Sequence, residues 1–153
     1  MSAAPWNPLA AETGIVAQVQ AIAQAPGTAW ARLVGTRKHL ADVAEEMQVT
    51  PAVYVVYDGF AVLPSSDEFT LQLSHRWLVV LALGHAASQR EAAQLNQAAG
   101  PYMGQLLIGL NGHQVPGCPE RLVAATPPRP YYSPARFAYF PLLFTHGSTH
   151  CNP

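Results

Sequence analysis

The chain is short of charged residues. Asp, Glu, Lys and Arg make up only 11% of its 153 residues, against about 25% in typical globular proteins. Eight basic residues nearly balance nine acidic ones, and this net charge of -1 disfavours nucleic-acid binding driven by Lys and Arg. Half of the residues are hydrophobic, which argues against disorder. With so few charges to cover its surface, the chain is expected to bury some of that surface against other chains.

The chain also has few cysteines and no long apolar run, and each shortage argues against one class of protein. Cys118 and Cys151 are too few for a disulfide framework, and they form either one bridge or two free thiols. No apolar run approaches the roughly 18 residues of a membrane span, since the longest, residues 77–83, has the length of a strand. The first eleven residues carry neither a positive charge nor a continuous apolar run, so we expect no secretory signal and a soluble product made inside the cell.

Short catalytic and cofactor motifs are also missing. The sequence has no G-x-S-x-G elbow, no G-x-G-x-x-G loop and no Walker A loop. The carboxylates of Glu45-Glu46 and of Asp67-Glu68 are adjacent in sequence, so the two side chains of each pair diverge in a helix or a strand. Catalytic carboxylates must converge on one substrate bond, so these pairs are expected to lie on a solvated surface. We therefore predict no enzyme activity, no catalytic residues and no cofactor.

The histidines offer one candidate metal site. His146, His150 and Cys151 form an H-x-x-x-H-C cluster whose side chains suit zinc. The cluster has three ligands at the end of the chain, and a fourth, Cys118, would have to come from elsewhere, so we predict no metal site. His75 lies on the apolar side of a strand pattern and is expected to be a core or subunit-contact histidine.

Hydrophobic periodicity predicts an α+β fold in a single domain over residues 1–153. The sheet is expected to be mostly antiparallel, with about five strands flanked by helices, and residues 1–9 and 147–153 are expected to be loose. Pro141 suggests an edge position or a bulge for its strand. The predicted helices cover residues 10–24, 37–47 and 88–111, with an interruption at Gly100-Pro101, and the predicted strands cover residues 29–34, 52–57, 68–84, 121–125 and 136–145.

The segment from residue 68 to residue 84 has the clearest pattern. Its side chains alternate with a period of two, and its first half is polar on one side while its second half is apolar on both. Such a strand would span roughly 50 Å, whereas a usual strand of five or six residues spans about 20 Å. We expect a long β-hairpin, formed with the preceding segment, that projects beyond the body of the domain.

Four segments, taken in order, resemble a known family. They are residues 50–59 (TPAVYVVYDG), 75–82 (HRWLVVLA), 98–101 (AAGP) and 139–144 (YFPLLF). In this order and spacing they are similar to tail terminator proteins of long-tailed bacteriophages, also labelled minor tail protein U-like. The resemblance spans about residues 15–145, but it does not include the proline-rich stretch 115–134 or the His/Cys tail.

The resemblance implies a structural virion protein without catalytic residues. Such a protein forms a homohexameric ring at the head-proximal end of the phage tail, where it ends polymerisation of the tail tube and joins the tail to the head. Its partners would be copies of itself, the major tail tube protein and the head–tail connector. DNA would pass through the lumen without specific binding, no membrane would be involved, and assembly would take place in the host cytoplasm.

Two groups of residues are candidates for the subunit or tube interface. One lies on the polar side of the long strand, where a one-sided polar face suits contact with a neighbouring subunit or with the tube. In the other, two arginines flank two tyrosines, which either stack on a base or form the rim of a protein contact, and the low net charge favours the protein contact. The candidates are Glu68, Gln72, Arg76, Arg129, Tyr131, Tyr132 and Arg136.

Two alternatives remain open at this point. The first is another neck or tail-completion component of the same particles, distinguished by whether it contacts the last tube ring. The second is a small ligand-binding or metal-dependent hydrolytic domain, which would need a concave pocket with convergent polar groups and the His146, His150 and Cys151 cluster ordered around a metal.

Overall fold

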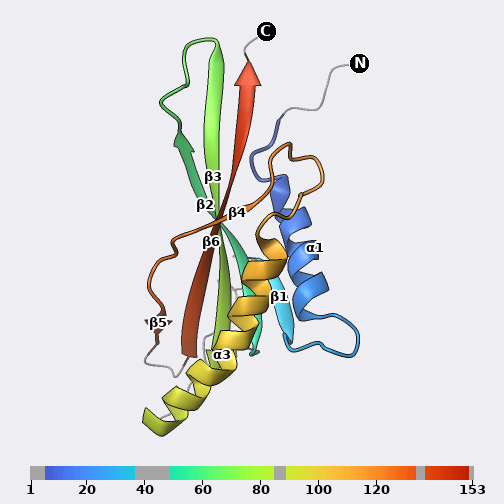
Figure 1. Cartoon of the computed structure of the whole chain (residues 1–153), viewed down its shortest axis with the longest axis vertical. Coiled ribbons are helices and arrows are strands. Elements are labelled where there is room, and N and C mark those ends of the chain that lie inside the picture. The colour runs from blue at the N-terminus through green and yellow to red at the C-terminus, as the bar shows by residue number, and fades with distance from the viewer. Residues whose placement is uncertain (1–5, 37–48, 85–88, 134–136, 152–153) are drawn as a thin grey trace.

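The computed structural model describes residues 6–36, 49–84, 89–133 and 137–151 (Figure 1). Its elements are α1 (Ala11–Ala23), β1 (Leu33–Thr36), β2 (Ala52–Val62), β3 (Thr70–Gly84), α3 (Gln89–Leu110), β4 (Val123–Ala125), β5 (Tyr131–Tyr132) and β6 (Phe137–Cys151). The strands form one sheet in the order β1-β2-β3-β6-β4, and β5 also pairs with β6. β1 runs parallel to β2, whereas every other pairing is antiparallel. The predicted α+β class with a mostly antiparallel sheet is therefore confirmed, with six strands in place of about five.

The three long strands β2, β3 and β6 form the centre of the sheet. β3 is the strand expected from the period-two pattern, and it pairs with β6 along its whole length. β2 pairs with the other side of β3, but the register shifts between Tyr57 and Phe60. Gly59 lies in this bulge with φ of 86°, a conformation that glycine adopts without strain. Asp58-Gly59 therefore forms a bulge inside a longer strand.

One prediction about the last strand is wrong, and another holds only locally. The segment after residue 146, expected to be loose, continues as strand to Cys151, because β3 provides an antiparallel partner over this length. Pro141, expected at an edge or a bulge, lies opposite Val80 within a strand that has neighbours on both sides. On the side of β6 away from β3, β4 and β5 pair with residues 143–145 and 138–139, so no strand of the described ranges pairs with Pro141 on that side. The strand is locally an edge at Pro141, and the missing N–H of proline is tolerated there.

The helices agree in part with the sequence pattern. α1 matches the predicted helix, and its buried residues recur at every fourth position. α3 continues through Pro101 without the predicted interruption. Ala99 and Leu106, on either side of the proline, are both buried in the core, and this packing keeps the helix continuous. The first predicted strand, residues 29–34, is displaced to Leu33–Thr36, and the helix predicted for residues 37–47 lies outside the described residues.

One face of the sheet carries the main core. Alternate residues of β3 point to this face, where α1 and α3 pack. Ala52, Tyr54 and Ala82 form a second, smaller cluster on the opposite face. The main cluster contains residues of both helices and of all three long strands, among them Ile15, Val19, Val53, Val55, Trp77, Val79, Leu81, Leu106, Leu110, Phe140 and Phe144. No helix in the described part of the chain is long and apolar enough to cross a membrane.

The long strands reach past the helices. Figure 1 shows α1 and α3 beside one half of the sheet, while the far ends of β2, β3 and β6 extend beyond both helices. We call residues 52–57, 77–84 and 137–144 the covered half of these strands, and residues 58–62, 70–76 and 145–151 the distal half. The loop that joins β2 to β3, residues 63–69, lies at the tip of the distal half, where the backbone N–H of Asp67 donates to the carbonyl of Thr70.

Candidate functional site

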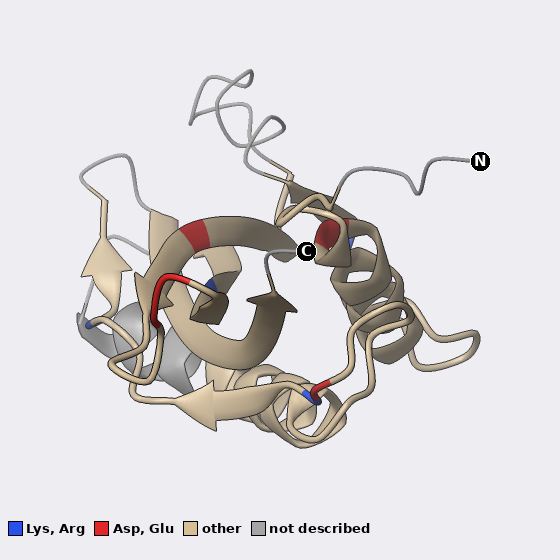
Figure 2. Ribbon diagram, turned by 90° about the horizontal axis from the view of Figure 1, so that it is seen from above, with Lys and Arg blue, Asp and Glu red and all other residues tan. Residues whose placement is uncertain are grey.

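The first group of predicted interface residues lies in the distal half. Glu68 is exposed in the β2–β3 turn and precedes the strand on which it was expected. Gln72 is half-buried, and its side-chain oxygen accepts a hydrogen bond from Ser65. Arg76 is exposed and pairs with Asp58 across the strands, with 3.2 Å between Nη2 and Oδ2. The ribbon seen from above has few positions coloured as charged residues (Figure 2).

The second predicted group lies elsewhere on the sheet. Tyr131 and Tyr132 form β5 and are exposed, as is Arg129 just before them. β5 pairs with residues 138–139 of β6, which face residues 82–83 of β3, about 20 Å along the strand from the first group. Arg136 lies outside the described residues. The structure therefore does not bring the two predicted groups together, and they belong to two separate surfaces.

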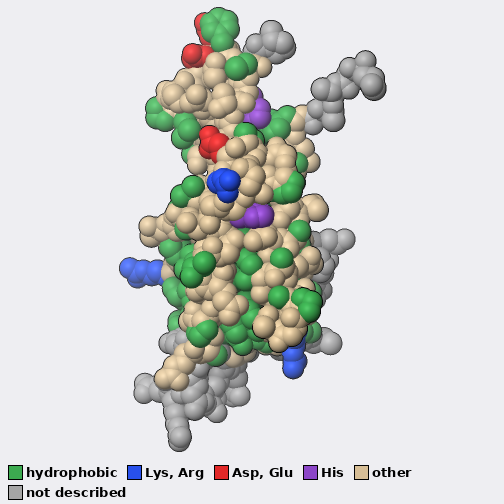
Figure 3. All heavy atoms as spheres, turned by 45° about the vertical axis from the view of Figure 1, so that its right-hand side comes forward, with side chains coloured by type: hydrophobic (Ala, Val, Ile, Leu, Met, Phe, Trp, Pro, Cys, Tyr) green, Lys and Arg blue, Asp and Glu red, His purple; other side chains and the backbone are tan. Residues whose placement is uncertain are grey.

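Exposed apolar side chains gather on the distal half. Phe60 and Val62 of β2 share one face of the sheet with Leu71 of β3, and the indole of Trp6 lies beside the same face. Trp6, Phe60 and Val62 are each about half exposed, at 49%, 54% and 57%, and Leu71 is 38% exposed. We call these four side chains the distal patch. An apolar cluster of this kind on a chain with few charges indicates an interaction surface. Figure 3 shows how hydrophobic side chains reach the surface over one whole face.

A hydrogen-bonded histidine network lies under the distal patch. His75 is only 1% exposed, as expected for a core histidine. Its Nδ1 lies 3.0 Å from the Tyr57 hydroxyl, and its Nε2 lies 2.7 Å from the Ser148 hydroxyl, which is also 3.0 Å from Nε2 of His150. Both ring nitrogens of His75 therefore have partners, so the buried imidazole is fully satisfied.

His146 is the less satisfied neighbour of His75. The indole N–H of Trp77 donates to its Nε2 over 3.1 Å, so the neutral ring carries its proton on Nδ1. That Nδ1 is buried and has no well-formed hydrogen bond among the described residues, although the Gly147 backbone lies close enough to favour the protonated ring. Burial lowers the pKa of His146, outweighing the opposing effects of Gly147 and Glu120. Burial lowers the pKa of His75 too, and the neighbouring imidazoles add to this effect.

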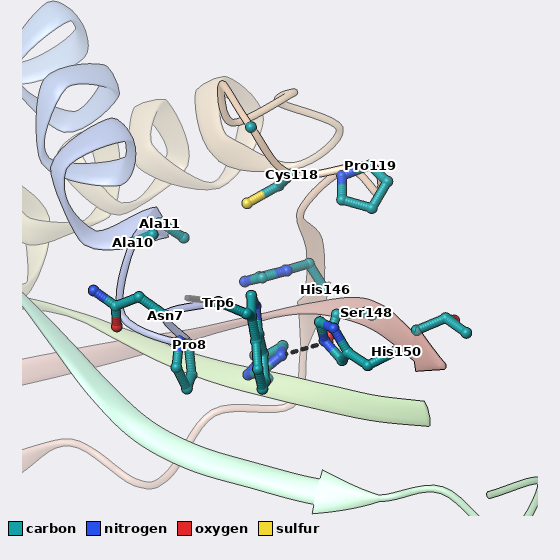
Figure 4. A pocket seen from close by; sticks show the side chains of 14 residues that line it. Trp6, Asn7, Pro8, Ala10, Ala11, Cys118, Pro119, His146, Ser148 and His150 are labelled. Atoms are coloured by element: carbon teal, nitrogen blue, oxygen red, sulfur yellow. Dashed lines mark hydrogen bonds between the residues drawn. The ribbon is translucent and has the colours of Figure 1, made fainter. Parts of the chain in front are cut away.

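These side chains border a cavity of about 310 Å³. The cavity lies between the N-terminal segment, the loop at residues 117–119 and the end of β6. Figure 4 shows the imidazole of His146 pointing into it, between Cys118 and Trp6. Trp6 forms one wall and packs against His150 with ring centroids 3.7 Å apart. This contact holds residue 6 on the sheet, although the whole lead-in was expected to be loose.

The arrangement does not assemble the zinc site that was weighed from the sequence. Along a strand, His146 and His150 point to one face and Cys151 points to the other. No group of three or more His, Cys, Asp or Glu side chains in the described ranges is placed to hold a metal ion. The H-x-x-x-H-C spacing suggested a cluster only as long as the end of the chain was taken to be a loop.

Sequence patterns contained little sign of the distal patch or the cavity. Trp6 stands in a lead-in without periodicity, and it meets His150 only because the two ends of the chain fold together. Phe60 follows the bulge at Gly59, so the run that predicted the first part of β2 ended before it. Period-two alternation did place His75 inside, because that signal is local.

A family model identifies the family of this chain. No curated protein sequence matches the chain. Among solved structures, a chain from a structure titled "Virion of native gene transfer agent (GTA) particle" is similar, with 16% sequence identity and a TM-score of 0.49 over 89% of this chain and 95% of that one. The family model described as phage tail terminator protein matches residues 6–150, which is nearly the whole described chain. The chain therefore belongs to the phage tail terminator protein family.

Proposed function

We propose that six copies of this chain close into a ring at the head-proximal end of the phage tail tube, end tube polymerisation and join the tail to the head connector. The observation that carries the proposal is the match of the tail terminator family model to residues 6–150. Members of this family are structural proteins of the phage tail. The ring, its six-fold symmetry and its partners, the tube protein and the connector, are the parts that we propose.

Features of the sheet support assembly. β1 pairs with β2 only as far as Val55, so no strand of the described residues covers the outer edge of β2 beyond that point. Asp58 and the bulge at Gly59 protect the start of this edge, whereas Phe60 and Val62 beyond them are apolar and half exposed. A head-to-tail contact repeated around a closed ring would cover such an edge on every copy.

The charge distribution suits a lumen through which DNA passes. Basic residues number eight, one fewer than the acidic residues, and the ion pair between Arg76 and Asp58 neutralises one of them. Strong phosphate binding needs clusters of Lys and Arg, and a wall without such clusters would let DNA slide past. The proposed partners are therefore proteins, and the DNA is bound without specificity.

The ring is tested by native mass spectrometry of the purified protein, alone and mixed with tail tubes. We expect a species of six times the 16.4 kDa chain mass, either alone or on the tubes, and electron microscopy should show it at one end of each tube. Tubes assembled with the protein should stop growing, whereas tubes without it should continue. Binding to the connector but never to a tube end would favour another neck component. A strict monomer that binds neither would refute the proposal.

The polar residues of the long strand provide a finer test. We propose that Glu68, Gln72 and Arg76 face a neighbouring subunit or the tube. Replacing all three with Ala should leave thermal unfolding nearly unchanged, because the side chains lie at or near the surface. The variant should form fewer rings or join tubes poorly. Normal assembly would remove these residues from the interface.

A further inference from the structure

The loop between β2 and β3, residues 63–69, presents an exposed aromatic side chain on a well-braced backbone. Phe69 is 67% exposed, more than any other aromatic side chain of the described residues. Oδ1 of Asp67 accepts the backbone N–H groups of Phe69 and Thr70, over 2.9 and 2.8 Å. The Ser66 hydroxyl bonds across the loop to the backbone N–H and carbonyl of Gln72, over 2.8 and 3.0 Å. A loop braced in this way loses little conformational entropy on binding. We call residues 63–69 the hairpin tip.

The hairpin tip is also acidic. Glu68 is exposed next to Phe69 and makes no ion pair or hydrogen bond with another described residue. No Lys or Arg occurs between Lys38 and Arg76, so the sequence places no positive charge near Glu68 and Asp67. Figure 3 shows acidic side chains next to a hydrophobic one at the upper end of the molecule. An aromatic anchor beside two carboxylates fits a partner surface that is both aromatic and basic.

The chain itself carries such a surface at β5. Tyr131 and Tyr132 are 59% and 50% exposed. Arg129, just before them, is exposed and makes no ion pair or hydrogen bond with another described residue. No Asp or Glu occurs after Glu120, so the charged side chains in the sequence around β5 are all arginines. Tyrosine and arginine are among the commonest interface hot spots. We call Arg129, Tyr131 and Tyr132 the arginine–tyrosine surface.

The hairpin tip and the arginine–tyrosine surface are too far apart to meet within one chain. β5 pairs with residues 138–139 of β6, which lie opposite residues 82–83 of β3, whereas the tip ends where β3 begins at Thr70. At about 3.3 Å per residue, the two surfaces lie about 40 Å apart along β3. Figure 1 shows β5 near the end of the sheet opposite to the tip. The two surfaces are therefore available only to other molecules.

We infer that the hairpin tip of one copy docks on the arginine–tyrosine surface of the next copy. Phe69 packs against the two tyrosine rings, and Glu68 pairs with Arg129. A contact between two different surfaces of one chain is head-to-tail, and it generates a ring when the rotation closes. Each copy then contributes one surface to each neighbour, which explains why the predicted interface residues fall into two separate groups. This inference rests on the proposed ring and names one of its subunit contacts.

Charge reversal tests the pairing of Glu68 with Arg129. Glu68→Arg and Arg129→Glu each place like charges in the contact, so each variant should need a concentration at least about tenfold higher to form rings. Both changes in one chain restore opposite charges and should bring that concentration back to within about threefold of the unchanged chain. Both positions are exposed, so thermal unfolding should be nearly unchanged in all three variants.

Two further variants complete this test. Arg32→Glu is the matched control, because Arg32 precedes β1, is exposed like Arg129 and makes no ion pair with another described residue. It should form rings like the unchanged chain. Phe69→Ala removes the aromatic anchor, which is exposed in the monomer, so stability should stay nearly the same. Ring formation should again need a concentration at least about tenfold higher.

Mixing the two single variants gives the sharpest result. The Glu68→Arg copy has a reversed tip and an unchanged arginine–tyrosine surface, whereas the Arg129→Glu copy has the opposite combination. Copies of one kind therefore repel each other at the contact, but alternating copies meet with opposite charges at every contact. Native mass spectrometry should find hexamers with equal numbers of the two variants in the mixture and few hexamers of either variant alone.

Other outcomes overturn the inference. Hexamers of normal stability from both charge variants would refute the contact while leaving the ring intact. A loss of assembly that neither the double change nor the mixture restores would show that the two positions do not face each other. Normal hexamers of Glu68→Arg that no longer bind tubes would assign the tip to the tube protein. Equal loss in Arg32→Glu would show an effect of net charge alone. Failure of the unchanged chain to form any ring would refute the proposed function itself, so the two failures are distinguishable.

Discussion

The covered half and the distal half of the three long strands are continuous in backbone but differ in how they are stabilised. In the covered half, Val79 and Leu81 are fully buried among apolar side chains from α1 and α3. In the distal half, the same face of β3 carries His75, held by hydroxyl groups, and Leu71, which is 38% exposed. A single strand can thus change from hydrocarbon packing to polar bonding within a few residues, according to what lies against it.

This difference has a consequence for assembly. Hydrophobic burial in the covered half is complete within one chain, so this half provides most of the stability of the monomer. The distal half leaves Phe60, Val62 and Trp6 half exposed. It therefore has apolar surface still available for contact with other chains, which is what an assembly protein needs.

The largest expected effect comes from equal truncations in the two halves. Leu81→Ala should lower the free energy of unfolding by about 2–5 kcal/mol, because it opens a cavity in a fully buried core. Leu71→Ala, on the same face of the same strand, should cost less than about 0.5 kcal/mol in the monomer. Chemical denaturation measures both. Similar losses of stability at the two sites would show that the two halves are equally well packed, and the distinction between them would be wrong.

The second effect concerns the hydroxyl that holds His75. Ser148→Ala removes the partner of Nε2 and leaves a buried ring nitrogen without a hydrogen bond, which should cost about 1–3 kcal/mol. Thr149→Ala is the matched control, because Thr149 is exposed next to it, and it should change stability by less than about 0.5 kcal/mol. Thermal unfolding compares the two. Equal Tm values would mean that the network does not stabilise the distal half.

A third, smaller effect is expected where Glu120 reaches β6. A Cβ on Gly147 would collide with the Glu120 carboxylate, so Gly147→Ala should displace it and break its bond to the backbone N–H. The loss should be about 1 kcal/mol. Gly104→Ala in α3 is the control, because a Cβ there meets nothing within 4 Å, and it should stabilise the helix by about 0.5–1 kcal/mol. A neutral Gly147→Ala would argue against the Glu120 contact.

The smallest effect is a response to mild acid. The folded protein holds the pKa of His75 and His146 below the usual 6.5, so below about pH 6.5 the unfolded chain takes up protons that the folded chain does not. The stability that these two neutral histidines contribute is therefore fully present above that pH and is lost as the pH falls. Between pH 7.5 and 5.5, Tm should drop by about 2–4 °C. The double variant His75→Gln, His146→Gln should lose most of this dependence, and an unchanged Tm in the parent chain would contradict the assignment.

Local patterns predicted the covered half well. Alternation over residues 68–84 predicted β3, apolar residues at helical spacing predicted α1, and a run at residues 52–57 that is apolar on both sides predicted the first part of β2. These signals are reliable because burial on one side repeats with the period of the strand or helix. They also placed His75 correctly inside, although the hydroxyls that bind it come from other strands.

Contacts between distant segments escaped those patterns. Pro141 suggested an edge strand, but β6 has neighbours on both sides, and the proline is tolerated because β4 and β5 leave a gap beside it. The predicted interface residues were drawn from two stretches that the sheet holds far apart, and Trp6 was assigned to a loose segment although it packs against His150.

The amino-acid sequence by itself determined which segments become strands and helices, how few charges the surface carries and which family the chain resembles. Only the tertiary structure decided that the last strand extends to Cys151, that three histidines gather beside a cavity and that the distal patch stays uncovered. The reason is physical. Periodicity records which side of a segment is buried, whereas the partner that buries it, or fails to, is fixed by pairings between residues far apart in the chain.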